Sequence, residues 1–154
     1  MPYNNPVPAA IAIVRVRRND GALSLLGIER KLSPVGGIAL PGGYVDENEN
    51  ARSAAARELW EEARLVTKPS QWRLLEDRNA QNRLLLFCEF MYEIPEDILM
   101  DFVPTKEVSR VLCLSPQTDI CFPNHLDVAR TYLDNACPGG YPMLRPMMDM
   151  SPEL

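Results

Sequence analysis

The sequence predicts an α/β fold, in which helices cover both faces of a mixed or largely antiparallel sheet as an α/β/α sandwich. Segments rich in β-branched residues alternate with apolar repeats at helical spacing, and their order is strands, helix, strands, helix. A chain of 154 residues fits one domain better than two. We therefore expect a single domain over residues 1–137 and an irregular tail, rich in proline and methionine, over residues 138–154.

The first part of the chain predicts three strands. Residues 11–17 are rich in isoleucine and valine, which favour extended backbone. Asn-Asp-Gly at residues 19–21 is a turn signal because it tolerates positive φ angles, so residues 22–30 should return as an antiparallel strand. After a proline- and glycine-containing loop, residues 38–43 predict a short strand that ends in a tight glycine turn.

Residues 50–65 are the clearest predicted helix. Alanine is the best helix former, and the apolar residues of this segment share one face: Ala51, Ala54, Ala55, Leu59 and Ala63. Asn48 or Asn50 is expected to cap the start, because an asparagine side chain accepts hydrogen bonds from the unpaired N–H groups of the first turn.

The second half of the chain predicts three further strands and one helix. The strands are expected over residues 71–76, 83–92 and 107–114. The helix is expected over residues 124–135, where apolar side chains recur on one face.

Three carboxylates on the first helix carry the functional prediction. Glu58, Glu61 and Glu62 stand at positions i, i+3 and i+4, so they share one helix face. Like charges at this spacing repel each other, whereas a hard cation such as Mg²⁺ prefers carboxylate and carbonyl oxygens. From the triplet alone, a solvated acidic surface is the alternative.

The residues around this triplet resemble the Nudix box. Gly43 is followed by Glu49 and then by residues 57–62, in the spacing G-x5-E-x7-R-E-U-x-E-E, where U is aliphatic. Six fixed identities align by chance on the order of once in ten million start positions. The chain therefore resembles the Nudix hydrolases, and the resemblance extends over about residues 8–135.

The resemblance implies a divalent metal, Mg²⁺ or Mn²⁺, held by the box. Its expected ligands are Glu58, Glu61, Glu62 and the carbonyl oxygen of Gly42. Glu58 is alternatively the general base on the attacking water. Expected catalytic residues are Arg57, Glu58 and Glu61, joined by Glu107 as an acid outside the box.

Two supporting features and one departure accompany these roles. The resemblance implies an ion pair between Arg57 and Glu49 that orients the carboxylates, and Gly43 allows close backbone approach. The box normally closes with a glycine, but Arg64 stands at that position. A residue other than glycine at positive φ costs about 1 kcal/mol or more, so either Arg64 accepts strain or the helix ends differently.

Further acidic residues and the one histidine are weaker candidates. Behind Glu107 as the outside acid stand Glu93, Glu96 and Asp101, although acidic side chains are mostly plain surface. His125 is expected to be structural or exposed, because no partner for catalysis is evident.

Arginines and tryptophans outside the active-site pattern have two interpretations. Arg15, Arg17 and Arg30 are candidates for substrate phosphates, but arginines on strands are more often solvated. Trp60 and Trp72 are expected to pack in the core rather than stack on a base.

The resemblance implies a metal-dependent hydrolase that cleaves a phosphoanhydride bond in a nucleoside-diphosphate-linked small molecule. Residues 40–45 favour ADP-ribose or nucleotide-sugar substrates, while deoxynucleoside triphosphates and NADH stay open. The alternative is a non-catalytic domain of this fold that senses a nucleotide.

The net charge and the search for targeting segments limit the partners and the location that we expect for this protein. A net charge of −5 argues against polymeric nucleic acid. The sequence shows no signal peptide and no apolar run of membrane-spanning length, so a cytoplasmic protein is expected. The tail over residues 138–154 is expected to pack on its own domain or on a second subunit of a homodimer.

Overall fold

The chain is described here by a computed structural model that covers residues 4–136. The tail predicted over residues 138–154, with its expected docking, lies outside the described residues. No helix in the described part is long and apolar enough to cross a membrane.

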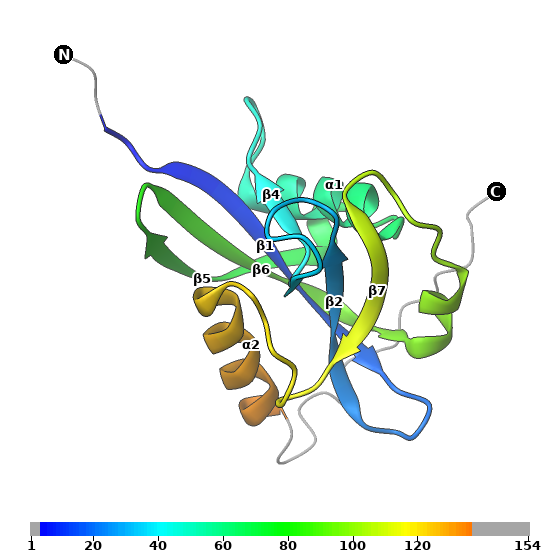
Figure 1. Cartoon of the computed structure of the whole chain (residues 1–154). Helices are drawn as coiled ribbons and strands as arrows, with labels where there is room; N and C mark the ends of the chain where they lie inside the picture. Colours follow the sequence, from blue (N-terminus) through cyan, green and yellow to red (C-terminus); the bar gives the residue numbers. More distant parts are fainter. Residues whose placement is uncertain (1–3, 137–154) are drawn as a thin grey trace.

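One seven-stranded mixed sheet forms the centre of the molecule (Figure 1). The strand order is β3-β2-β1-β6-β5, while β4 pairs with β1 and β7 pairs with β2. The central β1 and β6 run parallel, and the other pairs are antiparallel. The strands are β1 (Val7–Arg17), β2 (Leu23–Arg30), β3 (Ile38–Ala39), β4 (Gly42–Tyr44), β5 (Trp72–Ala80), β6 (Arg83–Pro95) and β7 (Val108–Leu114).

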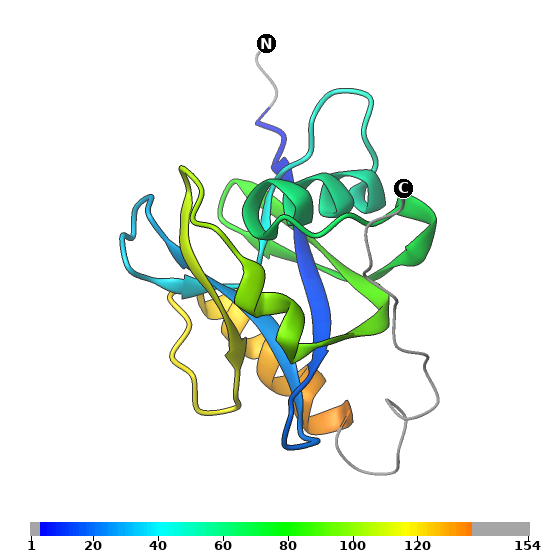
Figure 2. The same cartoon turned by 90° about the vertical axis from the view of Figure 1, so that its right-hand side faces the viewer.

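Two helices cover opposite faces of this sheet (Figures 1 and 2). The helix α1 (Ala51–Ala63) packs its alanines on one face, and α2 (Pro123–Ala136) packs on the other. β1 is buried on both faces, because Ala10, Ala12 and Val14 meet the α1 core while Ala9, Ile11 and Ile13 meet the α2 core. The predicted α/β fold with a mixed sheet and flanking helices is therefore confirmed.

The glycine pair at the end of the third predicted strand does not form a turn, so that prediction was wrong. Gly42 and Gly43 lie in β4 and pair with Ile11 and Ala10 of β1. A Cβ atom at Gly42 would come within 2.5 Å of the Ala10 carbonyl oxygen. Glycine is needed here for close approach of two backbones rather than for positive φ.

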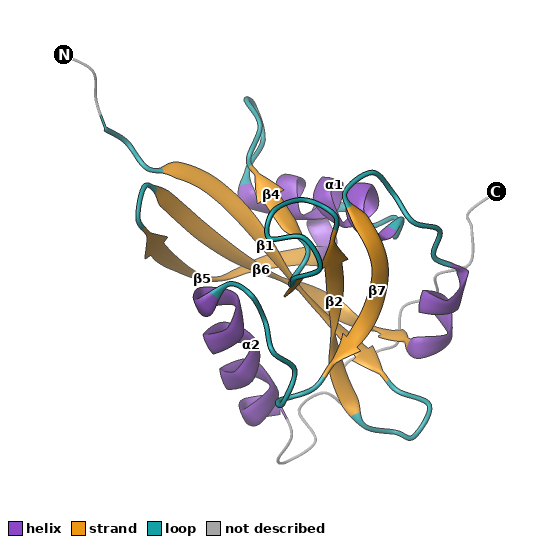
Figure 3. Ribbon diagram, in the orientation of Figure 1, coloured by secondary structure: helices purple, strands orange, loops and turns teal. Residues whose placement is uncertain are grey.

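The hairpin of β5 and β6 is longer than predicted (Figure 3). β5 continues to Ala80, and Gln81 turns the chain with a φ of 56°. No glycine or proline marks this turn, and β5 is a sheet edge with a polar outer face, so alternation and turn signals are weak. Two short 3₁₀ helices were also not predicted, η1 (Pro69–Gln71) and η2 (Glu96–Asp101).

Helix α1 has a defined cap at each end. The Asn50 side chain accepts a hydrogen bond from the Ser53 N–H at 2.9 Å, so Asn50 rather than Asn48 is the N-cap. Arg64 ends the helix in the left-handed region, with φ 60° and ψ 28°, and its N–H donates to the Trp60 carbonyl oxygen. The helix therefore ends in the left-handed conformation for which glycine is the usual residue, and Arg64 accepts the backbone strain.

The two tryptophans differ in burial. Trp72 is buried against Phe90, as expected. Trp60 is 45% exposed, so the expectation that it packs in the core was wrong. Its ring lies on the outer side of α1, where the Arg64 guanidinium is 5.0 Å from the ring centroid. This exposed cation–π contact adds about 0.5–1 kcal/mol in favour of an arginine at the cap.

Arg64→Gly is predicted to give a more stable protein than Arg64→Ala by about 1 kcal/mol. Both variants lose the contact with Trp60, but alanine keeps a Cβ at positive φ while glycine relieves the strain. Urea unfolding of the two variants measures the difference. Equal stabilities, or a more stable alanine variant, would contradict the left-handed cap.

His125 is the one histidine of the chain, and it is buried at 6% exposure near the start of α2. Its ring lies 5.0 Å from the Phe122 ring and 6.0 Å from the Phe87 ring. Burial first, and then the charge of Arg30, lower the pKa of His125 to about 4. The imidazole is therefore neutral in the folded protein at pH 7.

The contribution of His125 to stability should fall as the pH falls from about 6.5 to about 4. The unfolded chain takes up the proton near pH 6.5, whereas the folded chain resists it down to about 4. The free energy of unfolding, measured for wild type minus His125→Phe, should therefore drop by about 2–4 kcal/mol between pH 7 and pH 4. Taking the difference cancels titrations that both proteins share. A difference that does not change with pH would contradict the neutral buried ring.

Candidate functional site

Helix α1 holds four charged residues of the box beside β4. Two of the three predicted ligands are buried, with Glu58 at 7% and Glu62 at 4% exposure, while Glu61 is exposed. Carboxylates are rarely buried without a partner, because transfer of a charge out of water is costly. Burial of both Glu58 and Glu62 argues against a plain solvated acidic face.

Glu62 is tied to the backbone of β4. Its Oε1 atom accepts a hydrogen bond from the Gly42 N–H at 2.6 Å. The pKa of Glu62 is raised to about 8, mainly by burial and also by the charges of Glu58 and Glu107, while the hydrogen bond from the Gly42 N–H opposes the rise. The site therefore favours a positive charge near Glu62, or a proton on it.

Glu58 lies against Gly43, which has no side chain to block it. A Cβ atom at Gly43 would overlap the Glu58 carboxyl group, with the Oε2 atom 2.8 Å away. Burial raises the pKa of Glu58, and Arg57 partly offsets this. The absence of a side chain at Gly43 thus makes the space in which the Glu58 carboxylate lies.

Arg57 joins the acidic residues into one network. Its Nε and Nη2 atoms donate to the two oxygens of Glu49 at 2.8 and 2.9 Å. Its Nη1 atom donates to Glu58 at 2.9 Å and to Glu61 at 3.1 Å. The hydrogen bond with Arg57 lowers the pKa of Glu49, and the one with Glu49 raises the pKa of Arg57. The expected Arg57–Glu49 pair is therefore present and also holds two carboxylates of the triplet.

Among the acids outside the box, the structure brings Glu107 to this network. Glu107 is exposed just before β7, and its charge raises the pKa of both Glu58 and Glu62. Glu93 instead forms an ion pair with Arg17 at 2.7 Å. The pair engages a candidate for the outside acid and a candidate for substrate phosphates with each other.

The other candidates are placed elsewhere or engaged. Glu96 accepts a hydrogen bond from the Asn19 N–H, and Asp101 ends η2. Arg15 is fully buried within β1. Arg30 is the arginine that lies near the carboxylates, because its charge lowers the pKa of Glu62.

The donor set fits a hard divalent cation. Among the described residues, no three acidic, histidine or cysteine side chains converge as a metal site as they stand, because Glu58 and Glu61 turn to Arg57. Their negative charges nonetheless act on one another in a way that a cation would offset, since, in addition to burial, Glu58 raises the pKa of Glu62 and Glu61 raises the pKa of Glu58. Oxygen donors of this kind suit Mg²⁺ or Mn²⁺.

A cavity of about 270 Å³ opens on the other side of the β4 glycines. Gly42 and Gly43 line it, together with apolar side chains of β1, β6 and the segment before α2. Sequence reasoning missed this cavity, whose polar and aromatic lining comes from four separate segments: Arg30, Tyr44, Arg83, and the stretch that holds Phe122, Asn124 and His125.

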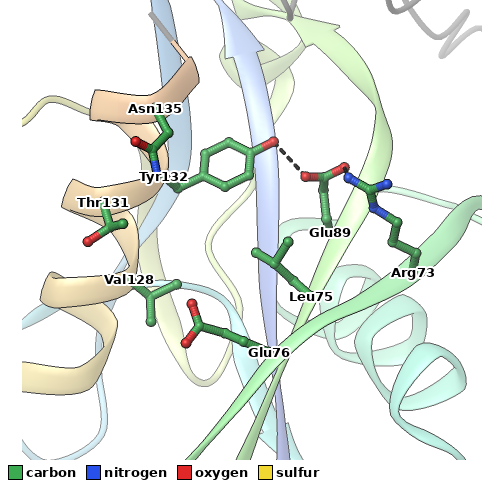
Figure 4. A pocket seen from close by; sticks show the side chains of 8 residues that line it. All are labelled: Arg73, Leu75, Glu76, Glu89, Val128, Thr131, Tyr132 and Asn135. Atoms are coloured by element: carbon green, nitrogen blue, oxygen red, sulfur yellow. Dashed lines mark hydrogen bonds and ion pairs between the residues drawn. The ribbon is translucent and has the colours of Figure 1, made fainter.

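A second cavity, of about 320 Å³, lies between β5 and the last turns of α2 (Figure 4). In it the Tyr132 hydroxyl donates to Glu89 at 2.8 Å, and Arg73 lies 3.2 Å from the same carboxylate. Although it is the larger cavity, none of the box residues lines it. We therefore place the candidate site at the smaller cavity, which is lined by Gly42 and Gly43, the two glycines against which the carboxylates pack.

Comparison with solved structures shows the same fold in distant relatives. A MutT/nudix family protein from Enterococcus faecalis matches with a TM-score of 0.70 at 16% identity, over 91% of this chain and 65% of that protein. The NUDIX domain of Shewanella oneidensis NrtR, in complex with ADP ribose, matches with a TM-score of 0.67 at 19% identity, over 86% and 90%. A bifunctional NMN adenylyltransferase/ADP ribose pyrophosphatase from Francisella tularensis matches with a TM-score of 0.62 at 21% identity, over 87% and 42%.

These lengths and sequences limit the comparison. The chain spans just under two thirds of the Enterococcus protein and less than half of the Francisella protein. No curated protein sequence matches the chain. The NUDIX domain family matches residues 6–116, which include the whole box and most of the sheet. The chain therefore belongs to the Nudix family, whose members are mostly hydrolases that use divalent metals.

Proposed function

We propose that this protein is a metal-dependent hydrolase that cleaves a phosphoanhydride bond in a nucleoside-diphosphate-linked small molecule. The observation that carries the proposal is the pair of buried carboxylates, Glu58 and Glu62, held against the β4 glycines beside an open cavity. These two carboxylates would bind Mg²⁺ or Mn²⁺, with Glu61 and the Gly42 carbonyl oxygen completing the proposed set of ligands. A bound divalent cation would neutralise phosphate charge and lower the pKa of water.

The side chains of the box have separate tasks in this proposal. Arg57 anchors the Oε1 atom of Glu58, which leaves Oε2 to bind the cation or, as the alternative, to take a proton from the attacking water. Glu49 fixes Arg57 through two hydrogen bonds, so the guanidinium cannot swing away. Glu107 supplies a further carboxylate at the rim, as the acid outside the box.

Two relatives favour ADP-ribose or a nucleotide sugar as substrate. One is the NrtR domain in complex with ADP ribose, and the other is the Francisella ADP ribose pyrophosphatase, also solved with AMP and a Mn ion. Arg83 lines the cavity of this chain and offers positive charge to a diphosphate. Deoxynucleoside triphosphates and NADH belong in the same test panel, with Mg²⁺ or Mn²⁺ and identification of products by mass.

The NrtR match also supports a second candidate function, a domain that senses a nucleotide without cleaving it. The intact carboxylate triplet favours the hydrolase. Tight binding of ADP-ribose with no turnover in Mg²⁺ or Mn²⁺ would favour the sensor. The cytoplasmic location and the homodimer stay predictions. Light scattering, which measures molar mass, tests the homodimer.

Glu62→Gln should lower turnover about a hundredfold with the fold intact, the order expected when a charge-stabilising group is lost. Glutamine keeps the size of the side chain and can still accept from the Gly42 N–H, so the change removes mainly the charge. Arg110→Met, on an exposed arginine of β7, is a matched control that should leave turnover unchanged. If Glu61→Gln and Glu62→Gln both keep the full rate in low Mg²⁺, the metal assignment is wrong.

Gly43→Ala and Gly42→Ala should fail in different ways. At Gly43 the added methyl group meets the flexible carboxyl end of Glu58, so turnover should fall at least tenfold while the fold persists. At Gly42 it meets backbone of β1, so stability should fall by about 1–3 kcal/mol, as in overpacked cores. Turnover and urea unfolding of both variants separate the two effects. A Gly43→Ala enzyme with the wild-type rate would contradict the proposed role of Glu58.

A further inference from the structure

Three side chains form a cluster on the α2 side of the candidate cavity. The Arg30 guanidinium lies 4.9 Å from the centroid of the Phe122 ring. The His125 ring lies 5.0 Å from that same ring, so Phe122 contacts both polar side chains. All three line the cavity that the β4 glycines also line. The cluster therefore stands between the box and α2.

Two polar atoms of this cluster are buried without a hydrogen-bond partner among the described residues. They are Nε of Arg30 and Nδ1 of His125. Arg30 does donate through Nη2 to the Ser33 carbonyl oxygen at 2.7 Å, which holds the guanidinium but leaves Nε unused. Both atoms have essentially no accessible surface, so a ligand in the cavity can reach only the outer nitrogen atoms of Arg30 and His125. A buried polar group without a partner costs about 1–3 kcal/mol, so this wall is kept polar at the expense of stability.

The rest of the cavity selects the kind of ligand. Its remaining walls are mostly apolar, formed by Ala9, Ile11, Leu40, Ala80 and Leu85, with Tyr44, Arg83 and Asn124 adding polar groups. Apolar walls suit a flat ring better than a sugar, whose hydroxyl groups would lose water without compensation. The volume of about 270 Å³ is small for a whole nucleotide conjugate, so the cavity takes one end of it.

We propose that Arg30 and His125 are specificity-determining residues that bind the nucleobase end of the substrate, with Phe122 holding both in place. This inference rests on the proposed function. Arg30 donates to an acceptor on the base, such as a carbonyl oxygen or ring nitrogen. His125 is neutral at pH 7 and its Nδ1 atom is buried, so Nε2 alone can form a hydrogen bond with the edge of a base, as donor or acceptor according to the tautomer. The neutral ring adds no charge toward phosphate.

The single histidine makes a direct test possible without catalysis. In a full-length chain without a histidine tag, the imidazole signals in an NMR spectrum belong to His125 alone. Free adenosine, guanosine, uridine and cytidine are titrated in turn, with ribose 5-phosphate as the ligand that lacks a base. At least one nucleoside should shift the His125 signals in a saturable manner, and ribose 5-phosphate should not.

Substitutions then test the two residues by calorimetry with the nucleoside that binds best. His125→Phe keeps a ring but no hydrogen bond, and should weaken binding about tenfold or more. His125→Gln keeps a donor and an acceptor, and should weaken it less than threefold. Arg30→Met should weaken binding at least tenfold, whereas its matched control Arg110→Met should have no effect.

The outcomes separate this inference from the proposed function. If ribose 5-phosphate shifts the His125 signals and no nucleoside does, or if no ligand shifts them, the inference is overturned. Hydrolysis of nucleotide conjugates with Mg²⁺ in the same preparation would then still support the hydrolase. Nucleoside binding without any hydrolysis would support the inference and count against the hydrolase.

Discussion

Two residues without side chains separate the carboxylates of α1 from the cavity on the α2 side of the sheet. Gly42 gives its N–H to Glu62, and the bare Cα of Gly43 leaves space for the Glu58 carboxyl group. Both glycines also line the cavity. A side chain at position 42 would collide with β1, and a side chain at position 43 would collide with Glu58. The close packing of the carboxylates on one side and the cavity on the other thus depends on β4 having no side chains at these two positions.

The electrostatics of the box follow from this close packing. Burying Glu58 and Glu62 raises the pKa of both, and Arg57 compensates only one of them directly. Arg57 is itself held by Glu49 and Glu61 as well as by Glu58, so its charge is shared among three carboxylates. The network is therefore short of positive charge at Glu62. Stability alone does not explain that arrangement, because a buried unpaired carboxylate is costly.

Sequence predicted what depends on local pattern and missed what depends on distant residues. Helix α1 and the box were evident because alanines and carboxylates recur at helical spacing, and β1 and β2 were evident from β-branched runs. The β4 glycines looked like a turn, since nothing local reveals that another strand approaches them. The burial of His125 could not be predicted, because it is set by Phe87 and Phe122 from separate segments. The predicted end of the edge strand β5 lies too early, because its sequence does not alternate between apolar and polar residues.

Arg30 links the two halves of the site. Its charge lowers the pKa of Glu62 on one side and of His125 on the other, so one guanidinium acts on both the carboxylates and the cavity wall. Phe122 and the Ser33 carbonyl oxygen fix its position. A ligand that engages Arg30 therefore changes the field at Glu62 without touching it, since partly buried charges are weakly screened. Binding in the cavity and cation binding at the box are thus expected to influence each other, and by linkage the influence is reciprocal.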